Sequence, residues 1–160
     1  MKKIGVWITG VTLSILILIC MAFPAMSSGN QRVLMAKFFK EPSAVNFGQS
    51  MATYHNLIRL SQSFLIIATI LFVLIGIVAI LQHFQQLKTK LPLNLLSKIV
   101  STIMLLSAIM SLVSCLLYIQ NISTHLTLGL SSILAVAFAL VNCGFQWFGL
   151  KKNETISLKQ

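Results

Sequence analysis

The residues that could do chemistry in this 160-residue chain are few and scattered. Glu41 and Glu154 are the only acids, and the topology derived below places them on opposite sides of a membrane, so they cannot form a catalytic carboxylate pair. The three histidines lack the His-x-x-Glu-His spacing of a zinc site. His55 and Glu41 could form a minimal acid–base pair, but solvated residues at the membrane surface are the simpler interpretation. We therefore expect no catalytic residue, no metal, no cofactor and no enzymatic activity.

Three cysteines, Cys20, Cys115 and Cys143, fall in three different apolar segments without a Cys-x-x-Cys motif. The sequence favours small buried hydrophobic residues at these positions. A Cys20–Cys115 disulfide is geometrically possible, because both residues fall in the outer halves of their segments, and this alternative stays open. An oxidoreductase that works through paired outer cysteines is not indicated.

Small and polar residues recur at helical spacing inside the apolar segments. Such residues let membrane helices approach closely or hydrogen-bond to one another. Helix packing is the favoured interpretation of this pattern, and a polar path for a solute is the alternative. The residues are the stripe Ser107, Ser111 and Ser114, the set Ser131, Ala135 and Ala139, the pair Gly10 and Ser14, and Asn142 with Gln146 four positions later.

Four apolar stretches are long enough to cross about 30 Å of hydrocarbon as helices. The chain is 57% hydrophobic and only 9% charged, and a backbone in lipid must satisfy its own hydrogen bonds. No ionisable residue falls in the middle of a stretch, which disfavours a proton-coupled transporter. A secretory signal peptide is the alternative for the first stretch, where a retained helix is favoured. The predicted spans are 4–26, 63–81, 99–118 and 126–150, within a single integral membrane domain, 1–160.

The distribution of basic residues predicts the orientation of these spans. If the N-terminus is cytoplasmic, the outer connections are 27–62 and 119–125, and the inner segments are 82–98 and the tail 151–160. The inner flanks then hold Lys2, Lys3, Lys88, Lys90, Lys98, Lys151, Lys152 and Lys159, and the outer flanks hold Arg32, Lys37, Lys40 and Arg59. The excess of lysine on the inner side favours cytoplasmic N- and C-termini in a plasma membrane.

The fold class that follows is an all-α membrane protein with four transmembrane helices in an up-down bundle. Phe145, Trp147 and Phe148, with Trp7 at the same depth, are expected to form an aromatic belt at the inner interface. The net charge of +10 is distributed along the flanks of the spans, where lipid head groups supply the opposite charge. The lipid bilayer is therefore the expected partner of the basic residues, and nucleic acid is not.

A short basic amphipathic segment lies in the first outer connection. In "QRVLMAKFFKEP" the apolar residues recur on one helical face and Pro42 ends the run, so the pattern predicts a helix lying at head-group level. The next residues are amphipathic without a breaker, so the second membrane helix is expected to begin near Ser50. The residues expected to contact lipid or a partner protein are Leu34, Met35, Lys37, Phe38, Phe39 and Lys40.

The layout resembles that of claudin-like tetraspan families, which have inner termini and a larger first outer loop, with a proline, here Pro24, near the outer end of the first helix. The resemblance implies a tetraspan topology along most of the chain. Those families carry a Trp-Gly-Leu-Trp motif and a cysteine pair in the first loop, whereas residues 27–62 contain neither Trp nor Cys. The disulfide-braced sheet of those families is therefore not expected in this chain.

These observations predict a small, non-enzymatic integral membrane protein that acts through protein–protein contacts, as an accessory or regulatory subunit or an immunity-type protein. The expected partners are the bilayer and another membrane protein or a second copy of the chain. The alternative is a subunit of a small-solute transporter or channel, with Ser111, Asn142 and Gln146 among the residues lining a polar path.

Overall fold

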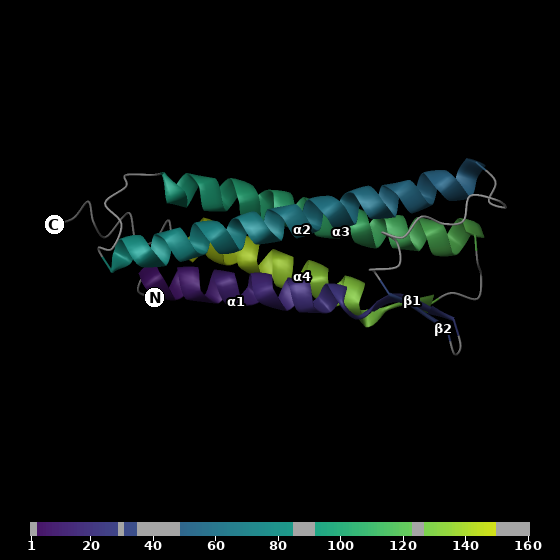
Figure 1. The fold of residues 1–160 in the computed structure, drawn as a ribbon, viewed down its shortest axis with the longest axis horizontal. Helices are drawn as coiled ribbons and strands as arrows, with labels where there is room; N and C mark the ends of the chain where they lie inside the picture. Colours follow the sequence, from purple (N-terminus) through teal and green to yellow (C-terminus); the bar gives the residue numbers. More distant parts are fainter. Residues whose placement is uncertain (1–2, 29–30, 35–48, 85–91, 123–126, 150–160) are drawn as a thin grey trace.

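Four long helices make up most of the described chain in the computed structural model, which describes residues 3–28, 31–34, 49–84, 92–122 and 127–149. They are α1 (Lys3–Met21), α2 (Gln49–His83), α3 (Leu93–Ile122) and α4 (Leu130–Gly144), and α4 continues into a π-helical turn, η2 (Phe145–Gly149). The helices lie side by side along the long axis of the molecule, and consecutive helices run in opposite directions (Figure 1). We call the end where α1 begins the terminal end, and the opposite end the sheet end.

Each helix contains a stretch that is long and apolar enough to cross a membrane. The four stretches are Ile4–Met21, Asn56–His83, Leu93–Asn121 and Leu130–Gly149. The prediction of four helices that are long and apolar enough to span a membrane is thus confirmed, and such helices are typical of a multi-pass membrane protein. The second and third stretches, of 28 and 29 residues, exceed the predicted 63–81 and 99–118. Because about 20 residues cross the hydrocarbon, these two helices either tilt or extend beyond it.

The first helix ends earlier than the predicted limit at Met26. α1 finishes at Met21, in a tightened turn in which the backbone N–H of Ala22 donates to the carbonyl of Ile19 at 3.0 Å. Residues Pro24–Ser28 then form strand β1. Proline disfavours the helical conformation of the residue before it and has no N–H to donate, so the helix cannot continue through Pro24.

A three-stranded antiparallel sheet at the sheet end joins the segment after α1 to the segment before α4. β1 pairs on one side with β2 (Gln31–Leu34) and on the other with β3 (Thr127–Leu128), so the strand order is β2-β1-β3. Met26 of β1 faces Val33 on one side and Leu128 on the other. The sheet is not braced by a disulfide, because Cys20, Cys115 and Cys143 are all free thiols. Backbone pairing thus links the segment after α1 to the segment before α4, which the sequence did not predict.

The amphipathic segment starts differently from the prediction. Gln31–Leu34 form an edge strand, so a helix in this segment cannot include Leu34. The other expected contact residues, Met35, Lys37, Phe38, Phe39 and Lys40, lie outside the described residues, as does Pro42. α2 begins at Gln49, next to the predicted start at Ser50.

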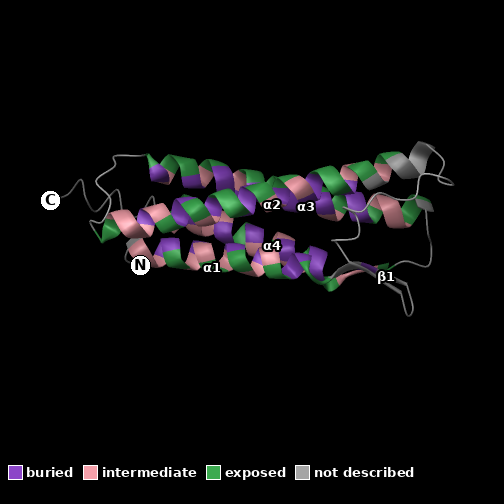
Figure 2. Ribbon diagram, viewed as in Figure 1, coloured by how far each residue is buried: buried purple, intermediate pink, exposed green. Residues whose placement is uncertain are grey.

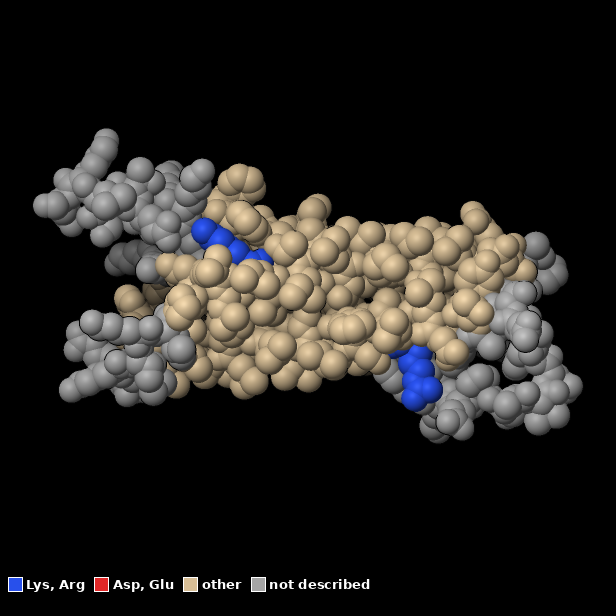
Figure 3. Space-filling view, turned by 90° about the horizontal axis from the view of Figure 1, so that it is seen from above, with Lys and Arg blue, Asp and Glu red and all other residues tan. Residues whose placement is uncertain are grey.

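Burial follows the inner faces of the four helices, and large apolar side chains cover much of their outer faces (Figure 2). The buried core runs from Val6 and Trp7 at the terminal end to Met26 of β1 at the sheet end, with Phe72 and Met104 fully buried between. On the face seen in Figure 3, the described Lys and Arg side chains lie toward the two ends, and the broad middle carries no charge. An apolar exterior of this kind matches a hydrocarbon surrounding rather than water.

Candidate functional site: a buried polar cluster between α1 and α4

All seven polar residues that the sequence places between helices or along a path are buried within the chain, including Ser14 of α1 and Ser131 of α4. Ser107, Ser111 and Ser114 lie on α3, Asn142 lies on α4, and Gln146 lies in η2. Their side chains face other helices of the same chain rather than the surrounding lipid. Any polar path that they line therefore has to run inside one chain and not between two copies of it.

Asn142 and Gln146 meet the predicted pair Gly10 and Ser14 of α1. The side-chain amide of Asn142 donates a hydrogen bond to Oγ of Ser14 at 3.3 Å. The hydroxyl of Ser14 in turn donates to the carbonyl of Gly10 at 2.9 Å. A Cβ atom on Gly10 would lie 2.7 Å from Nε2 of Gln146 and 3.1 Å from Oδ1 of Asn142. We call Gly10, Ser14, Asn142 and Gln146 the polar cluster.

The absence of a side chain at Gly10 is what lets this cluster form. The same Cβ would lie 2.9 Å from Cε1 of Phe72 on α2, so side chains from two neighbouring helices contact the backbone of α1 at one point. Real Cβ atoms do not approach other atoms this closely, because interiors are packed at van der Waals contact. Gly10 thus fixes the separation of α1 from α4 and positions both amides.

Gln146 reaches the cluster from a π-helical turn that the sequence analysis did not anticipate. Asn142 and Gln146 were expected on one regular helix, but the backbone N–H of Phe145 bonds to both Val141 and Asn142, and Phe145–Gly149 continue as η2. In the same turn Gly149 packs against Val6 of α1. Short π-helical turns are rare and are frequent at functional sites. The sequence "FQWFG" carries no pattern from which the wider turn could have been read.

The interior holds more hydrogen-bonding capacity than the described residues satisfy. Both amide atoms of Gln146, Oδ1 of Asn142 and both amide atoms of Gln62 on α2 are buried without a partner among these residues. The hydroxyls of Ser111 and Ser132 are in the same state. Leaving such a group unpaired costs about 1–3 kcal/mol. A water molecule or a small polar solute would satisfy these groups by hydrogen bonding to them. Besides packing the helices, the polar interior could therefore bind such a molecule.

Several other buried hydroxyls are satisfied by their own helices. Ser114 donates to the carbonyl of Met110 at 2.6 Å, and Thr69 donates to that of Leu65 at 2.6 Å. Side chains that bond back to the preceding turn present a nearly apolar, small surface to the neighbouring helix. These residues therefore fit the packing interpretation. The amides of Gln62, Asn142 and Gln146 and the hydroxyls of Ser111 and Ser132 remain as the groups that could bind something else.

The predicted aromatic belt is only partly exposed. Trp147 and Phe148 lie on the outer surface, whereas Trp7 is 4% exposed and packs inside the terminal end. The indole N–H of Trp147 donates to Oγ1 of Thr102 on α3 at 3.2 Å, and Nζ of Lys98 lies 5.7 Å from the centroid of the Trp147 ring. These contacts hold η2 against the first turns of α3. Trp7 is buried and lines a pocket together with residues of α2 and α3, which the sequence position alone does not reveal.

The structure gives no support for a site built from ionisable groups. No set of three His, Cys, Asp or Glu side chains is grouped for metal binding in the part of the chain that is described. Both acids, Glu41 and Glu154, lie outside the described residues, and the side chain of His55 is not described. The acid–base pair considered from the sequence is therefore untested.

Comparison of the chain with protein-family models, with curated proteins and with solved structures finds no match in any of the three.

Proposed function

We propose that this chain is a plasma-membrane protein with four up-down spans and cytoplasmic termini that acts, without catalysis, by contacting another membrane protein. The apolar exterior of the four helices and the separation of cations toward their two ends support the membrane placement. The excess of lysine on the terminal-end flanks supports the orientation. A reporter that is active only in the cytoplasm, fused after Gln160, would be active in this topology and inactive in the reverse one.

The edge position of β2 carries the proposal of a protein contact. Among the described residues β2 pairs with β1 alone, so none of them occupies its other edge, and a strand from a partner could pair there. Its last residue, Leu34, leads directly into "MAKFFK", which supplies two aromatic rings and two lysines. Aromatic residues dominate the energetics of many interfaces. An open strand edge followed by basic and aromatic residues favours an extramembrane binding surface over a passive tether.

Site-specific photo-crosslinking in native membranes tests this proposal. A photoreactive amino acid at Val33 of β2 should give a discrete protein adduct, whereas one at Ile15 on the exposed face of α1 should label lipid. The Val33 adduct should be lost in a Phe38→Ser/Phe39→Ser variant. If Val33 and Ile15 both give only lipid adducts, the contact proposed for the sheet end does not exist.

A second function, passage of a small polar solute through the chain, is favoured by the unpartnered amides. Asn142 and Gln146 lie near the middle and the terminal end of α4–η2, and Gln62 lies on α2, so polar groups recur along the interior. A path that uses them would run within the bundle.

Stopped-flow permeability of proteoliposomes to water and glycerol tests the second function. The unmodified chain should raise permeability above that of empty liposomes, and Ser111→Leu with Asn142→Leu should abolish the increase by filling the interior with apolar groups. Thr12→Leu is the matched control, because Thr12 is exposed and bonds only to Ile8 of its own helix. Equal permeability with the double variant would exclude the path.

A further inference from the structure

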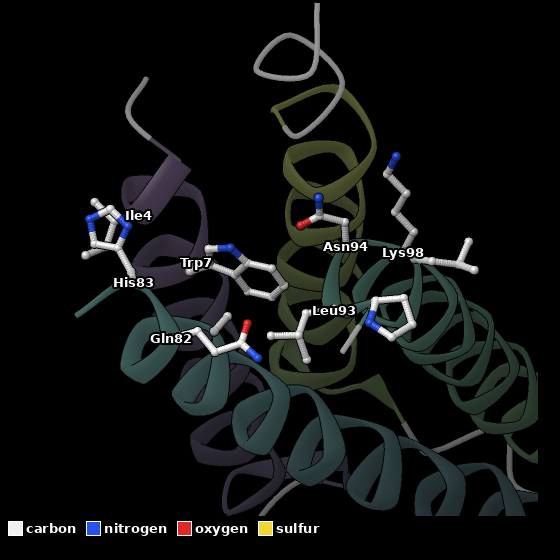
Figure 4. Close-up of a pocket in the computed structure, with 10 residues that line it drawn as sticks. Ile4, Trp7, Gln82, His83, Leu93, Asn94 and Lys98 are labelled. Atoms are coloured by element: carbon white, nitrogen blue, oxygen red, sulfur yellow. The ribbon is translucent and has the colours of Figure 1, made fainter. Parts of the chain in front are cut away.

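A pocket of about 590 Å³ opens at the terminal end, where α1 begins, α2 ends and α3 begins (Figure 4). One part of its wall is apolar and includes Ile4, Leu93 and Leu95. The other part carries hydrogen-bonding or basic side chains, among them Trp7, His83 and Lys98. The pocket is separate from the polar cluster and takes no part in the function proposed above.

Trp7 presents an unused donor to this pocket. Its side chain is buried, at 4% exposure, and lies at the centre of the lining residues in Figure 4. No acceptor for its indole N–H is found among the described residues, although the nitrogen is not sealed from the pocket. Buried indole N–H groups usually have a hydrogen-bond partner. The orphaned donor therefore points to a ligand with an acceptor atom at this position.

The charge around the pocket has one sign. Lys98 stands at the rim, with its Nζ above the Trp147 ring, and the described residues include no Asp or Glu to neutralise it. His83 lies on the opposite side of the pocket (Figure 4). The pocket also lies beside the start of α3, where the positive end of the helix dipole favours an anion and the first turn contains no acid.

We propose that this pocket binds a phosphate-bearing anion, supplied by the head group of an anionic phospholipid. A phosphate can accept a hydrogen bond from the Trp7 indole and lie at the positive end of the α3 dipole, while Lys98 supplies the counter-charge. The apolar wall, with Leu95 62% exposed beside it, provides a surface for the glycerol and the first part of the acyl chains. Basic pockets between membrane helices bind anionic head groups in the same way.

Fluorescence quenching by brominated lipids tests the proposal directly. The chain contains two tryptophans, so Trp147→Phe leaves Trp7 as the only reporter and keeps an aromatic ring under Lys98. In liposomes of mixed lipids, brominated phosphatidylglycerol should associate with the Trp7 site about fivefold more strongly than brominated phosphatidylcholine, the preference expected from one basic side chain. Lys98→Gln should remove most of this preference.

Arg59→Gln is the matched control, because it removes a cation from α2 near the sheet end, away from the pocket. It should leave the preference unchanged. Equal quenching by the two lipids in the Trp147→Phe chain would overturn the proposal, and so would an equal loss of preference in the Lys98→Gln and Arg59→Gln variants.

Inorganic phosphate distinguishes the two sources of the anion. If millimolar phosphate relieves the quenching, the site is assigned to phosphate itself. If the quenching persists in phosphate, the site is assigned to the lipid. If Trp147→Phe does not fold, native mass spectrometry of the unmodified chain supplies the same comparison. It should retain phosphatidylglycerol about fivefold over phosphatidylcholine, and Lys98→Gln should lose that excess; equal retention overturns the proposal.

Discussion

Substitution of Gly10 by alanine should show how closely α1 approaches α4. A methyl group at this position would meet Nε2 of Gln146 at 2.7 Å, Cε1 of Phe72 at 2.9 Å and Oδ1 of Asn142 at 3.1 Å. Gly5 lies one and a half turns earlier on the same helix, and a methyl group there would meet no atom of a neighbouring element within 4 Å, so Gly5→Ala is the matched control. The two variants differ in whether the added methyl group has room.

The expected changes in the free energy of unfolding differ between the two variants. Alanine in place of glycine inside a helix stabilises by up to about 1 kcal/mol, and this gain applies to both. Overpacking a filled interior costs about 1–3 kcal/mol, and this cost applies only at Gly10. Gly5→Ala should therefore be up to about 1 kcal/mol more stable than the unmodified chain, and Gly10→Ala about 1–3 kcal/mol less stable than Gly5→Ala.

Unfolding by sodium dodecyl sulfate in mixed micelles, followed by tryptophan fluorescence, measures these differences. Gln146→Ala should rescue Gly10→Ala in part, because it removes the side chain that the methyl group meets first. The double-mutant cycle should give a coupling of about 0.5–3 kcal/mol, typical of residues in contact. If Gly10→Ala is as stable as Gly5→Ala, or if the coupling is zero, α1 and α4 do not approach as described.

Three further predictions concern other groups. Gln146→Met should raise the free energy of unfolding by about 1–3 kcal/mol, because it removes two buried polar atoms that lack partners and keeps the shape; no gain in the same detergent titration would mean that Gln146 is hydrogen-bonded. Ser14→Ala should lower the free energy of unfolding by about 0.6–2 kcal/mol, because the hydrogen bond from Asn142 is removed. A smaller decrease for Ser14→Ala in an Asn142→Leu background would confirm that this hydrogen bond is the cause. Mass spectrometry after alkylation in denaturant without a reductant should find all three cysteines modified, whereas a mass two alkyl groups short would reveal a disulfide.

The helical content and the four spans were predictable because hydrocarbon imposes a simple rule. In lipid, the N–H and C=O groups of the backbone have no water to bond and must pair with each other. A long, continuously apolar stretch therefore forms a helix. The pair Gly10 and Ser14 and the pair Asn142 and Gln146 could likewise be picked out by their spacing. The sequence could not show that these two pairs face each other, since that depends on how α1 and α4 are rotated about their axes.

The features that the sequence missed depend on contacts between distant segments. β1 forms because Pro24 ends α1 and because Gln31–Leu34 and Thr127–Leu128 are available to pair with it. Edge pairing overrides the helical periodicity of Leu34 and its neighbours, a common outcome for short segments in which propensity is weak. The sequence places Trp7 in an exposed belt because its depth can be read from its position, whereas its burial beside α2 and α3 cannot.

The buried amides provide a way to separate the two proposed functions within one variant. An apolar residue of the same shape at Gln146 should stabilise the bundle. The amide therefore lowers the stability of the chain, and helix packing alone does not explain why it is present. If the interior carries a solute, Gln146→Met should gain stability and lose permeability together. If the chain works through the sheet end, the same variant should gain stability and keep the Val33 crosslink, because β2 lies at the other end of the bundle from η2.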